Sequence, residues 1–165
     1  MSFFVFVSAI LILIDQLVKQ WALRELQAMH TMPILENVFH LTYVENRGAA
    51  FSMLSGRVSQ WFFVGLAAVI TASILVLLYK KMMQTKLGEC ALLLIAAGAV
   101  GNAIDRAVHG FVVDLFDFRL INFAIFNVAD IYICVGGALF VAYVLFQHKD
   151  QADVPAVTEE TLRDE

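Results

Sequence analysis

The sequence has 165 residues, of which 61% are hydrophobic and only 16% are charged, with a mean hydropathy of +0.78. Soluble domains are about 45 to 50% apolar and about 25% charged, so this composition excludes a soluble globular protein and indicates a protein that lies in a bilayer. The net charge of -4 arises largely from an acidic tail after His148, and no basic run suggests a nucleic-acid partner.

The first apolar segment, about residues 3–27, is predicted to be a membrane span that the protein keeps. No basic residue precedes its apolar run and no small-residue cleavage site follows it, which argues against a cleaved signal peptide. Asp15 and Lys19 stand four residues apart on one helix face, where they can neutralise each other inside the membrane. They form either an ion pair that fixes this helix to its neighbours or a contact to substrate, and the two roles are compatible.

Residues 29–60 are too polar and too broken by turns to cross a bilayer. Residues 39–43 alternate apolar and polar side chains, a period of two that is typical of a half-buried strand. The following residues, 45–51, combine the amide of Asn46 and the cation of Arg47 with Gly48 and small side chains. This stretch is either a turn that brings donors close to an extended peptide or a tight turn alone.

The second span is predicted at residues 61–79, which carry no charge and have an aromatic residue at each end. Lys80, Lys81 and Lys86 follow it directly. Because loops rich in lysine and arginine remain on the cytoplasmic side, this loop is predicted to be cytoplasmic. Both chain termini would then be cytoplasmic, and residues 29–60 and 106–127 would lie outside.

The third span is predicted at about residues 90–107 and the fourth at about residues 128–146. Gly98, Asn102 and Arg106 recur every four positions, so they share one face of the third helix near its outer end. Asp105 is predicted to form a helix-end ion pair with Arg106, and Asp130 falls in the first turn of the fourth helix. Residues 1–148 would form one membrane-embedded domain, and residues 149–165 a disordered cytoplasmic tail.

Two aspartates are predicted to meet at the outer ends of the last two spans. Asp114 follows the third span and Asp130 opens the fourth, so a connection that returns to the same membrane face brings both to one depth. Two neighbouring carboxyl groups cannot both ionise easily, so one acts as general base for water and the other as general acid. This is the chemistry of amide hydrolysis by an aspartyl dyad. Asp117 competes with Asp114 for this role on spacing alone.

Other functions have weaker support in the sequence. The four histidines are scattered, and no metal-binding spacing occurs, so neither a serine or cysteine nucleophile nor a metal or other cofactor is predicted. A small ion-coupled transporter would also need intramembrane carboxylates, but near the midplane and often with an internal repeat. A non-enzymatic assembly factor could use the same polar groups to join helices, and it would tolerate asparagine in place of either aspartate.

Five short motifs occur in a fixed order along the chain. They are Asp15-Gln-x-x-Lys19, Asn46-Arg-Gly-Ala-Ala-Phe51, Gly98-x-x-x-Asn102-x-x-Asp-Arg106, Val113-Asp114 and Phe126-Asn127-x-Ala-Asp130. On a chain of four spans, these motifs closely resemble bacterial lipoprotein signal peptidase, also called signal peptidase II. The resemblance implies four transmembrane helices, a small extracytoplasmic β-cradle and an amphipathic periplasmic segment.

The same resemblance implies an aspartyl endopeptidase that cuts prolipoproteins just before a cysteine carrying a diacylglyceryl group. It makes Asp114 and Asp130 the catalytic dyad, and the Val-Asp context favours Asp114 over Asp117. The residues implied to line the pocket or support the acids are Asp15, Lys19, Asn46, Gly98, Asn102, Arg106 and Asn127. The expected partners are lipid-modified prolipoproteins and membrane lipid, with no cofactor and no second subunit. The expected location is the bacterial inner membrane, with the site toward the extracytoplasmic face.

Overall fold

The computed structural model describes residues 2–48 and 57–152. Its long helices are α1 (Ser2–Trp21), α3 (Arg57–Tyr79), α4 (Lys86–His109) and α5 (Val128–Ala152). Within the described residues, four stretches are long and apolar enough to cross a membrane: Phe4–Met29, Gln60–Tyr79, Lys86–His109 and Val128–Phe146. The four predicted spans are therefore confirmed, and the protein is a multi-pass membrane protein.

The helix boundaries differ from the predicted ones at their polar ends. α4 begins at Lys86 rather than near residue 90, because the Thr85 side chain accepts a hydrogen bond from the Gly88 N–H and caps the helix. α5 continues to Ala152, past the predicted start of the tail at residue 149. The remainder of that tail, and the amphipathic segment expected after Gly48, lie outside the described residues.

The first span does not end with α1. It continues through a π-helical turn, η1 (Ala22–Leu26), and a short helix, α2 (Gln27–Met29). Ala22 and Leu26 are fully buried in this turn and form a core cluster with Val113 and Leu115 of the sheet. The C-terminal end of the first span is thereby packed directly onto the sheet.

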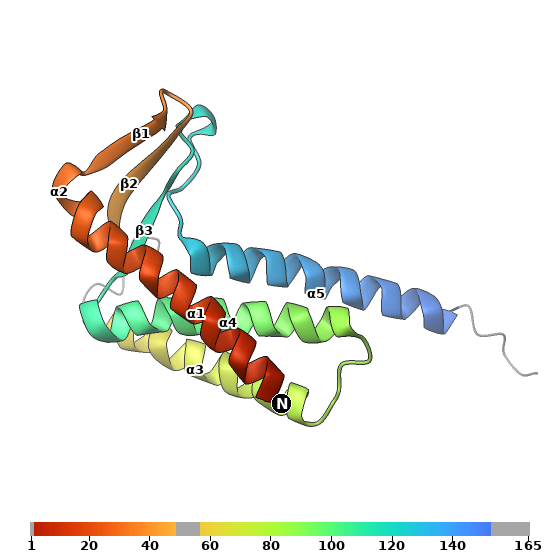
Figure 1. The fold of residues 1–165 in the computed structure, drawn as a ribbon. Helices are drawn as coiled ribbons and strands as arrows, with labels where there is room; N and C mark the ends of the chain where they lie inside the picture. The colour runs from red at the N-terminus through yellow and green to blue at the C-terminus, as the bar shows by residue number, and fades with distance from the viewer. Residues whose placement is uncertain (1, 49–56, 153–165) are drawn as a thin grey trace, which may run out of the picture.

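The sheet contains three antiparallel strands in the order β1 (Thr31–Leu35), β2 (Phe39–Asn46) and β3 (Val112–Asp117). The strand predicted at residues 39–43 lies within β2. β3 has no period-two pattern because its first four residues are all buried, as in strands that are covered on both faces. Figure 1 shows the sheet at the end of the bundle where α1 and α4 end and α5 begins.

α4 lies at the centre of the bundle and packs against α1, α3 and α5. Two glycines allow the close approach of α4 and α5. A Cβ atom on Gly98 would collide with the Ala129 carbonyl oxygen, and one on Gly136 would lie 2.8 Å from the Ala91 carbonyl oxygen. Small residues at such crossings let helix backbones touch, so the start of α5 is held against the C-terminal half of α4.

Candidate active site

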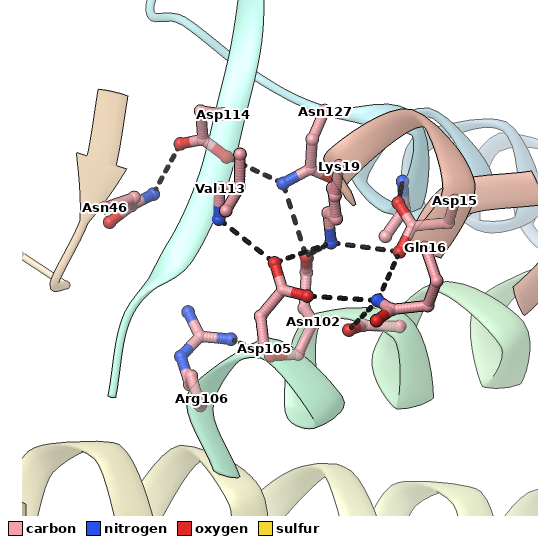
Figure 2. Close-up of polar contacts among 12 residues, drawn as sticks. Asp15, Gln16, Lys19, Asn46, Asn102, Asp105, Arg106, Val113, Asp114 and Asn127 are labelled. Atoms are coloured by element: carbon pink, nitrogen blue, oxygen red, sulfur yellow. Dashed lines mark hydrogen bonds and ion pairs between the residues drawn. The ribbon is translucent and has the colours of Figure 1, made fainter. Parts of the chain in front are cut away.

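Asp114 is buried in the middle of β3, with only 2% of its surface exposed. The antiparallel pairing of β2 with β3 aligns Val44 with Asp114 and brings Asn46 beside the same carboxyl group. Asn46 Nδ2 donates to Asp114 Oδ2 at 2.9 Å, and Asn127 Nδ2 donates to Oδ1 at 2.6 Å (Figure 2). Both oxygens of Asp114 therefore accept amide hydrogen bonds.

The environment of Asp114 works against its charged form. Burial, with a smaller contribution from the negative charge of Asp130, raises the pKa of the Asp114 carboxyl to about 6. The hydrogen bonds from Asn127 and Asn46 oppose this rise because they favour the carboxylate. Asp114 can therefore exist in either protonation state near neutral pH, as an acid or base in catalysis must.

Asp130 is held by the start of α5. The Asn127 N–H donates to Asp130 Oδ2 at 3.1 Å, and the Asp130 N–H donates to Asn127 Oδ1 at 3.0 Å. This reciprocal pattern satisfies two free backbone donors of the first helical turn, as a capping box does. Asn102 of α4 donates to the other oxygen, Asp130 Oδ1, at 2.8 Å. Asp130 is only half-buried, so it is the more accessible of the two acids.

Two asparagines join the predicted acids into one network. Asn127 donates through its side chain to Asp114 and through its backbone to Asp130. Its side chain also donates to Asn102 Oδ1 at 3.2 Å, and Asn102 in turn donates to Asp130. Asp114 of β3 and Asp130 of α5 are thereby brought into one hydrogen-bonded network.

Below this network lies a buried ion cluster formed by Asp15, Lys19 and Asp105. Lys19 Nζ lies 3.0 Å from Asp15 Oδ2 and 3.2 Å from Asp105 Oδ2, and each of the three side chains is at most 2% exposed. The ammonium group also donates to Asn102 Oδ1 at 2.8 Å. Figure 2 shows how this cluster links α1 to α4 beneath Asn127.

Each carboxylate of the buried ion cluster also holds the backbone beside one predicted acid. Asp105 Oδ2 accepts from the Val113 N–H at 3.0 Å, next to Asp114. Asp15 Oδ1 accepts from the Ala129 N–H at 2.9 Å, next to Asp130. One cluster therefore fixes the backbone of both predicted acids relative to α1 and α4.

The ion pair predicted between Asp105 and Arg106 is wrong, because Asp105 pairs with Lys19. Arg106 places its guanidinium 4.9 Å from the centroid of the Phe63 ring and makes a long hydrogen bond of 3.4 Å to the Asn102 carbonyl oxygen. Its Nε–H is buried and has no hydrogen-bond partner among the described residues. Arg106 therefore retains donor capacity close to the site.

Sequence reasoning missed two members of this network. Gln16 Nε2 donates to Asp105 Oδ1 at 3.0 Å and to the Gly101 carbonyl oxygen at 3.2 Å. Asp105 lies three residues after Asn102, a spacing that puts both on neighbouring positions of one helix surface and could have indicated its place. The adjacent Arg106 offered a simpler partner in the sequence. Gln16 stands in the first of the five ordered motifs, and that position is the signal that could have indicated its role.

Asp117, the competitor of Asp114, lies at the other end of β3 with different partners. Thr42 Oγ1 donates to Asp117 Oδ2 at 2.7 Å, and Arg119 Nε donates to the same oxygen at 2.9 Å. Burial acts to raise the pKa of Asp117, but these hydrogen bonds and the charge of Arg119 outweigh it and lower the pKa. Asp117 is thus stabilised as a carboxylate in an ion pair of the sheet.

Two glycines of α4 contribute through close packing. Gly98, predicted to line the pocket, faces the α5 backbone at Ala129. A Cβ atom on Gly101 would lie 2.6 Å from Asp15 Oδ2, inside the buried ion cluster. These positions need the smallest residue because a larger one would displace Asp15 or the first turn of α5.

Comparisons with known proteins agree with this architecture. The family model described as "Signal peptidase (SPase) II" matches residues 7–146. The chain is 46% identical over 143 residues to the lipoprotein signal peptidase of Clostridioides difficile (strain 630), which covers 87% of this chain and 95% of that protein. It is 39% identical over 138 residues to the lipoprotein signal peptidase of Yersinia enterocolitica serotype O:8 / biotype 1B (strain NCTC 13174 / 8081), covering 81% of each.

A similar solved structure is described as a bacterial membrane enzyme determined by the in meso method at 2.3 Å resolution. The two structures superpose with a TM-score of 0.80 at 26% sequence identity, and the match covers 94% of this chain and 93% of the other chain. The similarity therefore extends over the helices and the sheet alike. On the family match and the identity to these relatives, the chain belongs to the signal peptidase II family of bacterial membrane peptidases.

Proposed function

We propose that Asp114 and Asp130 are the catalytic dyad of this peptidase, and that it cuts its substrate just before a cysteine carrying a diacylglyceryl group. Membership of the family makes the chain an aspartic peptidase that cleaves the signal peptides of prolipoproteins. The observation that carries the dyad assignment is Asn127, which hydrogen-bonds to both carboxyl groups. No such bridge joins Asp117 to Asp130 in the described part of the chain.

In this mechanism one acid of the pair is ionised and the other holds a proton. The ionised carboxylate takes a proton from water as the water oxygen attacks the scissile carbonyl carbon, and the protonated acid donates its proton to the carbonyl oxygen. The tetrahedral intermediate then collapses, and the amine leaves with a proton from the pair. The shared proton belongs to the dyad as a unit, since the two groups interact electrostatically.

The remaining predicted residues have two roles in this proposal. Asn102, Asn127 and the buried ion cluster orient the two acids through the contacts described above. Arg106 and Asn46 lie at the edge of the network, where Arg106 offers the unpartnered Nε–H and a positive charge that acts on both acids. These donors are suited to hold the backbone carbonyl groups of an extended peptide.

The proposal includes the orientation of the chain in the membrane. The lysines between α3 and α4 favour a cytoplasmic position for that loop, so both termini face the cytoplasm and the sheet lies on the extracytoplasmic face of the inner membrane. We propose that the protein acts as a monomer, because every member of the network comes from one chain. The ion-coupled transporter gains no support, since Asp114 and Asp130 lie where span ends meet the sheet rather than near mid-span.

The substrate proposal is tested with two precursors of identical sequence, one carrying the diacylglyceryl group on its cysteine and one without it. The purified protein, reconstituted in lipid vesicles, is expected to cut only the modified precursor, on the amino side of the modified cysteine. Mass spectrometry of the products identifies the cleavage site. Equal cleavage of the two precursors, or cleavage at another bond, would reject the proposed specificity.

A further inference from the structure

The far end of the sheet carries a group of large apolar side chains that are open to the surroundings. Five side chains, each between 50% and 70% exposed, form what is called here the sheet tip: Ile34, Leu35, Leu120, Ile121 and Phe123. All five lie outside the four candidate membrane spans. Contiguous exposed apolar surface of this kind on a segment outside the membrane marks an interaction site.

The sheet tip is a single surface, although it comes from two distant segments. Ile34 and Leu35 end β1, whereas Leu120 and Ile121 belong to the 3-10 turn η3 (Arg119–Ile121). The Leu120 N–H donates to the Val38 carbonyl oxygen at 3.3 Å, across the turn between β1 and β2. The Phe39 and Phe118 rings lie 4.7 Å apart between their centroids. These contacts fix the two segments against each other.

The position of the sheet relative to the membrane follows from two attachments of β3. Val112 begins β3 three residues after His109 ends α4. At the other end, Phe116 pairs with Phe126, which directly precedes Asn127 and the start of α5. Both attachments are at the ends of spans on one side of the bundle. β3 therefore runs along the membrane boundary from α4 toward α5, over about 13 Å at 3.3 Å per residue.

The sheet tip lies beyond the second attachment. Figure 1 shows the β1–β2 turn and the η3 segment side by side, projecting past the start of α5 and away from α1, α3 and α4. Phe123 is only four residues from Asn127, so the chain cannot carry the tip far above the span end. No helix among the described residues covers the tip, so this surface is placed to face the lipid beside α5.

We propose that the sheet tip inserts into the interfacial layer of the outer leaflet beside α5. The transfer of isoleucine, leucine and phenylalanine side chains from water to the boundary between headgroups and acyl chains lowers their free energy. Exposed Glu36 in the adjoining turn limits the depth to a layer where a carboxylate remains hydrated. Because the same strand carries Asp114, insertion of the tip would fix the depth of the candidate site relative to the leaflet.

Site-directed fluorescence in vesicles tests this proposal without reference to peptidase activity. The free cysteines Cys90 and Cys134 are replaced with alanine, and single cysteines are introduced as Leu120→Cys, Ile121→Cys and, for reference, Lys86→Cys. The Lys86 side chain is 88% exposed at the opposite end of the bundle. Each variant is labelled with an environment-sensitive dye and reconstituted in phosphatidylcholine–phosphatidylglycerol vesicles.

Two quenchers distinguish the environments of the dye. Lipid that is spin-labelled near the headgroup end of its acyl chain is expected to quench most of the fluorescence of a dye at position 120 or 121. Iodide in the water on both sides of the vesicle membrane is expected to quench strongly only the dye on Lys86→Cys. Iodide quenching at 120 and 121 equal to that of the reference would overturn the proposal. Protection from both quenchers would also overturn it, because a protein partner or a second copy would then cover the tip.

Discussion

Asn46 illustrates how a single side chain sets the chemistry of an acid that is 68 residues away in the chain. The side-chain Nδ2 of Asn46 donates to one oxygen of Asp114, and the side-chain Oδ1 accepts a hydrogen bond from the Gly48 N–H at 2.9 Å. The second contact fixes which end of the amide faces the acid. Asn46 therefore acts only as a donor toward Asp114, which favours the carboxylate and opposes the effect of burial.

Replacement of Asn46 with alanine is predicted to raise the pKa of Asp114 further above about 6, because a hydrogen bond to the carboxylate is lost. A base must be ionised, so activity that depends on it disappears as the pH falls through its pKa. The acidic limb of the profile of kcat/KM against pH should therefore move to higher pH by about one pH unit. Asn37→Ala, in the β1–β2 turn, is the control and should leave the limb in place. An unmoved limb in Asn46→Ala would argue against this role.

Lys19 is predicted to be essential for stability, because it is the cation of the buried ion cluster. Lys19→Met leaves Asp15 and Asp105 buried without a counter-charge and should lower the free energy of unfolding by about 3 to 5 kcal/mol. The matched control is Lys86→Met. The Lys86 side chain is 88% exposed and pairs with Glu89 at the surface, so the free energy of unfolding is expected to change by no more than about 1 kcal/mol. The free energies of unfolding of the two variants are measured in the same detergent. An equal loss of stability in Lys19→Met and Lys86→Met would disprove the prediction.

At the scale of elements, the contact between α4 and α5 determines where Asp130 lies. The first turn of α5 is held by Asn102 through Asp130, by Asp15 through the Ala129 N–H, and by the absence of a side chain at Gly98. Because three different contacts act on one turn, a small displacement of α5 would disturb all of them together. Helix packing and acid geometry are coupled at this point.

Gly98→Ala is predicted to reduce both stability and cleavage, because the added methyl group would collide with the Ala129 carbonyl oxygen and push α5 away. Overpacking of this kind costs about 1 to 3 kcal/mol. Gly137→Ala is the matched control, since a Cβ atom there meets nothing within 4 Å. Thermal unfolding and the initial rate of cleavage are measured for both variants. The expectation fails if Gly98→Ala is as stable and active as Gly137→Ala.

The sequence predicted the elements whose pattern is local. Long, mainly apolar stretches indicated the four spans, and the spacing of Asn102 and Arg106 placed them on one helix face. β3 escaped prediction because burial on both faces removes the alternation that identifies a strand. Asp105 was assigned to the wrong partner because the chain shows which residues are adjacent, but not that α1 passes beside α4 and presents Lys19.

In the molecule as a whole, the sheet connects three spans at the same end of the bundle. β1 follows the first span, β3 follows α4, and the chain returns to β3 immediately before α5. The candidate site is assembled where these connections meet. Its parts are far apart in the sequence, as the bonds from Asn46 to Asp114 and from Asp15 to Ala129 show. The ordered motifs indicated these residues, but which of them hydrogen-bond to one another could be learned only from the folded structure.

The proposed orientation predicts opposite labelling of the two ends of the bundle. In a protein with Cys90 and Cys134 replaced by alanine, Arg47→Cys should react with a membrane-impermeant maleimide added to spheroplasts, because the Arg47 side chain is 69% exposed near the sheet. Lys86→Cys, at the start of α4 beside the lysines of the preceding loop, should react only after permeabilisation. The reverse pattern would show that the sheet faces the cytoplasm.

The central claim is that Asp114 and Asp130, and not Asp117, perform the cleavage. It is tested most directly with Asp114→Asn, Asp130→Asn and Asp117→Asn, each purified, checked for folding by thermal unfolding, and supplied with a diacylglyceryl-modified precursor. The first two variants are expected to fold but to lose cleavage, while Asp117→Asn still cuts because its carboxylate serves an ion pair of the sheet. Normal cleavage by folded Asp114→Asn or Asp130→Asn would overturn the assignment of the dyad.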